Sequence, residues 1–277
     1  MVRFNPQTSA TYVQMPPDSS TIRTASVFTI EIMQTAPQTP AARIHIEPGF
    51  AWDGQDAYLF DIDGTLLRNR DRIHRESFVI GVRQVTGFDI EQALFLTPGG
   101  TDPAILRDAF EKMEIPKAVI EAQWEAMVEA IHRACEERRQ EMDIRLMPGV
   151  QDVLAHLARK GAQLGLATGN LEAIGWIKME EAGLRECFRF GGFSDHFPIR
   201  AELVGNAARK ARELAGADAR VCVVGDTPRD IEAAHANRLP VISVATGNFS
   251  FDALLELRPE VCASSLADLL AHTQVAP

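Results

Sequence analysis

Short, uninterrupted apolar runs recur along the chain from residue 57 onward. They lie at residues 57–60, 163–167, 221–224 and 241–244. Runs of this kind are typical of strands that are buried on both faces, as in a parallel sheet covered by helices. Segments with a helical pattern separate them, at residues 150–160, 171–182, 201–214 and 229–236. This alternation predicts an α/β fold whose core is a doubly wound, Rossmann-like parallel sheet.

Residues 67–146 interrupt the alternation and have a mainly helical pattern. Apolar side chains recur there at spacings of three and four residues, in one stripe made of Trp124, Met127, Val128, Ile131 and Cys135. Such a stripe is typical of a helix that packs in a bundle. We therefore predict a small α-helical cap at residues 67–146, inserted into a core formed by residues 51–66 and 147–277. An insert placed directly after the first strand is well positioned to act as a lid.

The first 50 residues differ from the rest of the chain. They are rich in Thr, Gln, Pro and Ser, and only the alternating β-branched residues at 21–33 suggest a strand or hairpin. We predict that residues 1–50 form an N-terminal extension, flexible or loosely packed, and assign it no function. Residues 25–33 are its most apolar part, but Thr29 and Glu31 interrupt them, which argues against a signal peptide.

Composition narrows the class of protein. Hydrophobic residues make up 46% and charged residues 24% of the 277 positions, as is ordinary for a globular protein. No stretch approaches the roughly 20 apolar residues that span a bilayer. The formal net charge is −10 and the basic residues are dispersed, which argues against binding to nucleic acid or to an anionic membrane. We expect a cytoplasmic protein that is a monomer or a homodimer.

Polar residues follow three of the predicted strands directly. Asp61-Ile62-Asp63-Gly64-Thr65 follows the first, Thr168-Gly169-Asn170 the second, and Gly225-Asp226-Thr227 the third. The carboxyl ends of parallel strands meet at one edge of the sheet, which is where open α/β sheets bind ligands. We therefore expect these three groups to converge in space although they are distant in sequence.

The first group contains two carboxylates separated by one residue. On an extended strand end Asp61 and Asp63 point the same way, and Ile62 turns to the opposite face. Two adjacent carboxylates repel, so the pair requires a cation between them or a proton on one of them. A calcium-binding EF-hand loop is excluded, because no further acidic ligands follow at the needed spacing.

These motifs resemble those of the haloacid dehalogenase superfamily, in particular its phosphoglycolate phosphatase-like branch with a helical cap. Asp61-Ile62-Asp63-Gly64-Thr65 looks like the DxDGT first motif, and Thr168-Gly169-Asn170 is similar to the second. Residues 225–230, Gly-Asp-Thr-Pro-Arg-Asp, resemble the GDxxxD fourth motif. Three motifs in the right order, each after a predicted strand, are a specific signal, and the resemblance covers about residues 56–270.

The basic residue of the third motif has two candidates. Lys178 lies on the helix after the second strand, and residues 168–183 look similar to the branch of the family that contains TGN. In many relatives a lysine lies later, near the position where this chain has Arg200. We favour Lys178, and the alternative for it is a solvated lysine on a helix surface.

The resemblance implies a Mg²⁺-dependent phosphatase that acts on a small phosphorylated metabolite through an aspartyl-phosphate. Asp61 would be the nucleophile, and Asp63 would protonate the leaving group and then activate water. Thr168, Gly169, Asn170 and Lys178 would bind the phosphoryl oxygens.

The same resemblance implies a metal site. Asp61, the Asp63 carbonyl and Asp226 would hold Mg²⁺, and Asp230 would bind it through water or orient its ligands. Gly99-Gly100-Thr101-Asp102 resembles a cap loop that helps to select substrates. His74 and His196 fall near the predicted cleft, and we expect packing or surface roles for them. No histidine pair has zinc-binding spacing.

Two alternatives to a phosphatase stay open. A phosphomutase of the β-phosphoglucomutase type shares the acidic motifs, and a non-catalytic binding module is the alternative outside enzymes. The second is disfavoured because Asp61, Asp63 and Asp226 are all present. Phosphoglycolate is the first substrate to consider, with sugar phosphates, nucleotides and pyrophosphate open.

Overall fold

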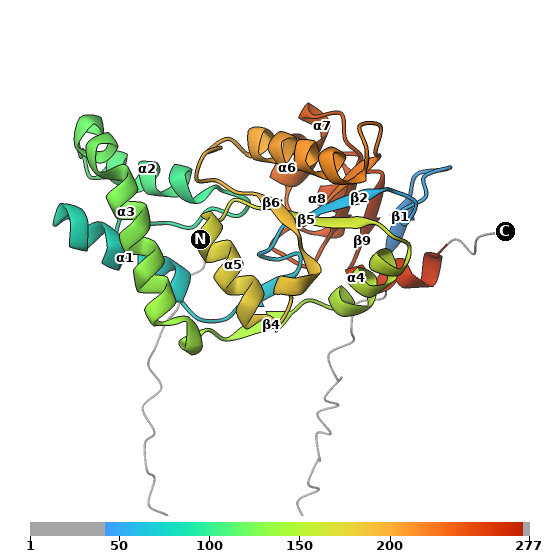
Figure 1. Ribbon diagram of the computed structural model, residues 1–277, viewed down its shortest axis with the longest axis horizontal. Helices are drawn as coiled ribbons and strands as arrows, with labels where there is room; N and C mark the ends of the chain where they lie inside the picture. Colours follow the sequence, from blue (N-terminus) through green and yellow to red (C-terminus); the bar gives the residue numbers. More distant parts are fainter. Residues whose placement is uncertain (1–41, 274–277) are drawn as a thin grey trace, which may run out of the picture. The chain divides into compact units, whose positions relative to one another are not determined.

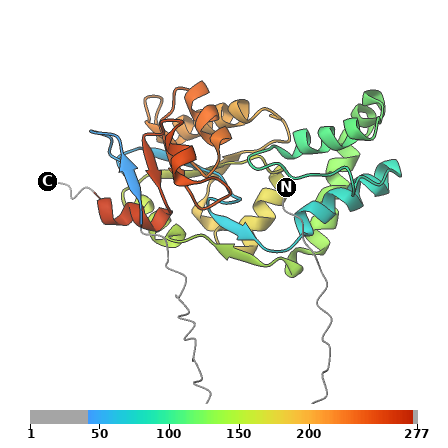
Figure 2. The ribbon, with the colours of Figure 1, turned by 180° about the vertical axis from the view of Figure 1, so that it is seen from behind.

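A computed structural model describes residues 42–273 of the chain. At their centre lies a seven-stranded sheet in the order β1-β9-β8-β7-β2-β5-β6. All neighbouring strands are parallel except β1, which pairs antiparallel with β9. Helices flank the sheet, and the cap helices project from one end of it (Figures 1 and 2). The predicted doubly wound α/β fold with a helical insert is confirmed.

The bounds of the elements follow the predicted alternation closely. The central strands are β2 (Ala57–Phe60), β5 (Gln163–Ala167), β6 (Phe190–Gly192), β7 (Val221–Gly225), β8 (Val241–Val244) and β9 (Val261–Ala263). The helices of the core are α4 (Val150–Arg159), α5 (Glu172–Glu181), α6 (Arg200–Ala215), α7 (Pro228–Ala236), α8 (Phe251–Leu255) and α9 (Leu266–Leu269). Short 3₁₀ turns lie at Arg139–Glu141, Arg185–Cys187 and Leu270–His272.

The apolar runs of the strands feed two separate layers of the core. Along β2, Tyr58 and Phe60 pack with α4 and α9 on one face of the sheet. Ala57 and Leu59 pack with α6 and α7 on the other face. Successive side chains of a strand point to opposite faces, so an uninterrupted apolar run is what burial on both faces requires.

The predicted boundary between the N-terminal extension and the core, at residue 50, is wrong because the sheet begins before it. Strand β1 (Ile44–Ile46) lies within the predicted extension and adds to the edge of the sheet next to β9. Its Ile44 and Ile46 pack against the layer that contains α9. The strand or hairpin predicted at residues 21–33 lies outside the described residues.

The insert consists of three helices and a strand pair. The helices are α1 (Ile73–Thr86), α2 (Asp102–Lys112) and α3 (Lys117–Glu137). Strands β3 (Leu67–Asn69) and β4 (Ile144–Leu146) pair antiparallel where the chain leaves and re-enters the core. Met127, Ile131 and Cys135 of the predicted stripe are buried, and they share one apolar cluster with Leu171, Ile174 and Ile177 near or on α5. The cap is therefore packed against the core through α5.

Candidate active site

The first acidic motif lies at the carboxyl end of β2, in the middle of the sheet. Asp61 follows Phe60 and is buried, while Ile62 turns into the apolar core. Asp63 is more open, with 43% of its side chain exposed. Gly64 has a φ of +92°, and a Cβ there would lie 2.4 Å from Oδ2 of Asp226. Glycine therefore lets the first loop pass directly beside the acidic residue that follows β7.

Three buried carboxylates meet beside this loop. One oxygen each of Asp61, Asp226 and Asp230 lies within 4.8 Å of the other two. Burial raises the pKa of Asp61, and the charges of Asp230 and Asp63 add to that effect against the opposing charge of Arg200. Burial likewise raises the pKa of Asp226 to about 8, reinforced by Asp61 and Asp230. The cluster thus carries more negative charge than its protein surroundings neutralise.

This excess of negative charge fits a divalent cation. Carboxylate oxygens are the ligands that Mg²⁺ prefers, and a bound cation offsets both the burial and the repulsion that raise these pKa values. Thr65 donates a 2.9 Å hydrogen bond to Oδ1 of Asp226, which fixes that carboxylate. At Gly247 a Cβ would lie only 1.7 Å from Oδ2 of the same residue, so glycine keeps the approach clear. Asp61 and Asp226 are the side chains best placed to hold the ion.

Arg200 is the basic residue next to Asp61. It is buried at the start of α6, and its Nη2 lies 2.9 Å from Oδ1 of Asp61. Its Nε and Nη2 donate to Oδ1 of Asp230 at 2.9 and 2.6 Å. Oδ2 of Asp230 accepts from the backbone N–H and the hydroxyl of Thr227, which closes the capping box of α7. Asp230 thus fixes the position of Arg200 and of Thr227 at the start of α7, and both of its carboxylate oxygens have protein partners.

Lys178 is also in the site, but beside Asp63. It is 1% exposed, so the interpretation as a solvated helix lysine is wrong. Its Nζ donates to Oδ2 of Asp63 at 2.6 Å and to Oδ1 of Asn170 at 2.7 Å, and it lies 3.1 Å from Nδ1 of His74. An ammonium group has three N–H donors, and these three acceptors account for all of them. Lys178 and Arg200 both line the cavity, Lys178 beside Asp63 and Arg200 beside Asp61.

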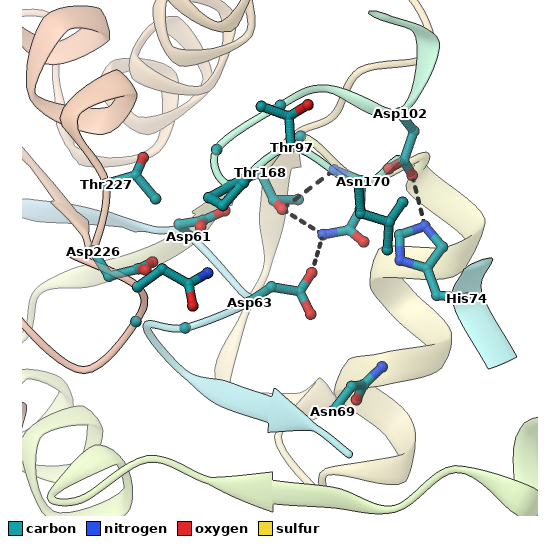
Figure 3. A pocket seen from close by; sticks show the side chains of 18 of the residues that line it. Asp61, Asp63, Asn69, His74, Thr97, Asp102, Thr168, Asn170, Asp226 and Thr227 are labelled. Atoms are coloured by element: carbon teal, nitrogen blue, oxygen red, sulfur yellow. Dashed lines mark hydrogen bonds and ion pairs between the residues drawn. The ribbon is translucent and has the colours of Figure 1, made fainter. Parts of the chain in front are cut away.

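Asn170 of the second motif joins Thr168 to Asp63. Nδ2 of Asn170 donates to Oγ1 of Thr168 at 2.7 Å and to Oδ2 of Asp63 at 2.8 Å (Figure 3). Oδ2 of Asp63 thus accepts from both Asn170 and Lys178. Burial raises the pKa of Asp63, but the charges and hydrogen bonds of its neighbours, Lys178 first among them, together outweigh it and the net shift is downward. Asp63 is held as a carboxylate with one oxygen, Oδ1, left for chemistry.

These groups line one cavity of about 670 Å³ at the carboxyl edge of the sheet. The floor is formed by the three motifs, and residues of the cap form the opposite wall. Cationic residues on its lining are Arg68, Arg72, Arg75, Lys178 and Arg200. A cavity that joins paired carboxylates to this much positive charge suits a small anion whose reacting group lies over Asp61.

The sequence prediction missed two residues of the cap. His74 of α1 and Asp102 of α2 both line the cavity, and their side chains lie 3.1 Å apart (Figure 3). The sequence predicts a packing or surface role for His74 and indicates Asp102 only as part of a specificity loop. No local pattern reveals their partners, because the contacts cross from the cap to the core.

Comparisons with known proteins agree with this geometry. A family model described as haloacid dehalogenase-like hydrolase matches residues 55–237. A phosphoglycolate phosphatase of Agrobacterium fabrum is 26% identical over 76% of this chain and 89% of its own length. A mutant of CbbY from Rhodobacter sphaeroides, solved with xylulose-(1,5)bisphosphate, is 22% identical with a TM-score of 0.56, over 80% of this chain and 100% of its own. A predicted phosphoglycolate phosphatase from Haemophilus somnus is 17% identical with a TM-score of 0.55, and the match covers 79% of this chain and 98% of its own.

Proposed function

Since the chain belongs to the haloacid dehalogenase-like hydrolase family, we propose that it is a Mg²⁺-dependent phosphatase that hydrolyses a small phosphomonoester, with Asp61 as the nucleophile. One observation carries the proposal. The buried carboxylate of Asp61 lies at the centre of the sheet edge, between Arg200 and the carboxylate of Asp226, and faces a cavity rich in cationic side chains. Phosphoryl transfer requires a well-placed nucleophile and neutralisation of charge on the transferring group, and these neighbours of Asp61 support both.

The first half-reaction transfers the phosphoryl group to the enzyme. An oxygen of Asp61 attacks phosphorus, a new Asp61–O–P bond forms, and the bond between phosphorus and the substrate oxygen breaks. Asp63 gives a proton to that leaving oxygen. Since Lys178 holds free Asp63 as a carboxylate, the proton enters with the substrate, whose monoanion carries one near neutral pH.

The second half-reaction releases phosphate. Oδ1 of Asp63 takes a proton from a water molecule, and the resulting hydroxide attacks phosphorus and breaks the Asp61–O–P bond. Asp61 returns as a carboxylate, and inorganic phosphate leaves together with the proton that Asp63 took from water, so Asp63 is a carboxylate again. Lys178 and Asn170 keep Oδ2 of Asp63 occupied through both steps, so the same oxygen serves as acid and base.

The remaining residues bind the phosphoryl group and the ion. The guanidinium of Arg200, the hydroxyl of Thr168 and the backbone amides near Asp63 and Gly169 are placed to bind the phosphoryl oxygens. Asp61, Asp226 and the carbonyl of Asp63 would hold Mg²⁺, which would supply charge neutralisation on the transferring group.

The substrate proposed is an anionic metabolite of modest size. Arg68, Arg72 and Arg75 line the cavity in addition to Arg200 and Lys178, which favours a substrate with negative charge beyond its phosphate. The name of the Agrobacterium relative makes phosphoglycolate the first compound to test.

The deciding experiment measures release of inorganic phosphate from a panel of phosphorylated metabolites and p-nitrophenyl phosphate, with Mg²⁺ and with EDTA. We expect Mg²⁺-dependent release from at least one compound. Isomerisation of a sugar phosphate without release would indicate a phosphomutase instead. A lack of turnover with every compound would reject the catalytic function.

A further inference from the structure

The cap contributes a buried hydrogen-bond chain that ends on Asp63. Oδ2 of Asp102 lies 3.1 Å from Nε2 of His74, and Nδ1 of His74 lies 3.1 Å from Nζ of Lys178. Lys178 in turn donates to Asp63. Asp102 is 3% exposed and the side chain of His74 is 13% exposed, so water competes little for these bonds. The chain therefore runs from α2 and α1 of the cap to the carboxylate beside the nucleophile.

The partners fix the tautomer of His74. Lys178 carries only donors, so Nδ1 of His74 must accept. Asp102 accepts at the other end, so Nε2 carries the hydrogen and donates it. His74 is then a neutral ring that presents a lone pair to Lys178. Without that lone pair, one N–H of a buried ammonium would have no acceptor, which is costly in a buried site.

The same aspartate joins the cap to the core. Oδ2 of Asp102 also accepts a 2.8 Å hydrogen bond from the backbone N–H of Leu171, and the N–H of Asp102 donates to the carbonyl of Gly169 at 2.8 Å. A Cβ at Gly169 would lie 2.3 Å from the carbonyl oxygen of Gly100, so the two backbones are in direct contact. The geometry of His74 is thus set by the contact between the cap and the second motif.

We infer that His74 and Asp102 are positioning residues of the cap, which orient Lys178 so that it holds Asp63 in place when the cap is docked. The inference rests on the proposed function of Asp63 in proton transfer. Neither residue touches the reacting atoms, and both act through Lys178. A substrate enclosed by the cap thereby meets an Asp63 whose free oxygen is already oriented, and a displaced cap removes one of the three acceptors of Lys178.

Two substitutions at His74 separate its acceptor from its donor. Asn places its amide oxygen where His places Nδ1, so His74→Asn keeps the acceptor for Lys178. Gln places its amide nitrogen where His places Nε2, so His74→Gln keeps the donor to Asp102 and loses the acceptor. His132→Gln is the matched control, because His132 is an exposed histidine of the cap on α3.

We expect His74→Gln to lower kcat by about 10- to 100-fold, the effect of losing one hydrogen bond to a charged group. KM should change much less, and His74→Asn should keep most of the wild-type kcat. His132→Gln should match the wild type in both constants. Equal losses in the two His74 variants, or an unchanged kcat in His74→Gln, would overturn the inference.

A second measurement does not depend on turnover. Side-chain ¹⁵N NMR of the full chain should show His74 protonated at Nε2 and not at Nδ1. A proton on Nδ1 in the wild-type protein would reject the chain of hydrogen bonds whatever the activity. A wild-type protein with this tautomer but no phosphatase activity would instead reject the proposed function alone.

Discussion

Nη2 of Arg200 lies 2.9 Å from Oδ1 of Asp61. The acidic cluster that contains Asp61 would also attract a divalent cation. Arg200 and a bound ion thus share the negative charge of one buried cluster. We expect Arg200→Gln to tighten binding of Mg²⁺ while it lowers kcat, because the competing positive charge and the phosphoryl ligand are lost together.

Isothermal titration with Mg²⁺ measures the first effect and steady-state kinetics the second. Arg220→Gln is the control, since Arg220 pairs with Asp56 on the surface and lies outside the cavity. Weaker Mg²⁺ binding in Arg200→Gln would show that the arginine organises the ligands rather than competing with the ion.

Asp61→Asn should abolish turnover and leave the fold intact. The amide is a poor nucleophile and has nearly the volume of the carboxyl group. We expect a loss of at least about 10⁴-fold in kcat, as for removal of other catalytic nucleophiles. Phosphate release gives the loss, and circular dichroism with thermal unfolding checks the fold. Activity above about one hundredth of wild type would rule out Asp61 as the nucleophile.

The metal-free protein should become less stable as pH rises. The pKa of Asp226 is about 8 in the folded chain, above the ordinary value of about 3.9 expected when unfolded. Between these values the folded state holds a proton that the unfolded state has lost, so stability is present at low pH and is lost as pH rises toward 8. Tm in EDTA should therefore fall across this window.

Asp226→Asn tests the cause of that loss. It removes one of the repelling carboxylates, so Tm in EDTA at about pH 8 should exceed that of the wild type. Its response to Mg²⁺ should be weaker in Tm and in turnover. A wild-type Tm that is independent of pH in EDTA, or an unchanged Mg²⁺ response in the variant, would contradict the assignment of Asp226 as a ligand.

Asp53 should stabilise the fold through an ion-pair cluster around its buried carboxylate, and none of the residues of this cluster lines the cavity. Its Oδ2 lies 2.8 Å from Nε2 of His156 and 2.9 Å from Nζ of Lys160 on or beside α4. Burial raises the pKa of Asp53, but the hydrogen bonds from His156 and Lys160 outweigh it and leave the pKa lowered. The stabilisation is therefore present above the ordinary aspartate pKa and is lost as pH falls through the lowered value.

We expect Asp53→Asn to reduce the free energy of unfolding by about 1–3 kcal/mol at neutral pH, because His156 and Lys160 lose a charged hydrogen-bond partner but remain partly exposed to water. The difference from wild type should shrink in acid. Asp56→Asn removes a carboxylate of an exposed pair and should cost no more than about 1 kcal/mol. Urea unfolding measures both, and equal costs would refute the role of this cluster.

Gly169→Ala should displace the cap loop. The added methyl would lie 2.3 Å from the carbonyl oxygen of Gly100, so the two backbones must separate. We expect kcat to fall with little loss of Tm. Gly183→Ala is the contrast, because its φ of +67° strains any side chain but the space around it is open. That variant should lose Tm and keep kcat, and activity retained in Gly169→Ala would argue against docking at this contact.

The sequence determined the order of the elements and the position of the acidic motifs. An apolar run such as residues 57–60 can be recognised because burial on both faces demands it, and the strand formed there as predicted. Asp61, Asp63, Thr168 and Asp226 were found for a related reason. Each follows a strand directly, and parallel strands bring their carboxyl ends to one edge.

Short edge strands were not predicted. Strand β6 contains Gly191 and Gly192, which are poor strand formers by composition, and β1 lies in a segment rich in Pro and Thr. Their pairing with neighbours already in place decides their conformation, so local pattern carries little of the information.

Only the tertiary structure decided the roles of the basic residues and of the cap. Lys178 and Arg200 were alternatives for one position in sequence, yet the fold uses both, one beside Asp63 and one beside Asp61. His74 and Asp102 gained their roles in the same way. The physical reason is that a hydrogen bond is set by positions in space, and the bonds that link the cap to Asp63 join residues 28 to 115 positions apart.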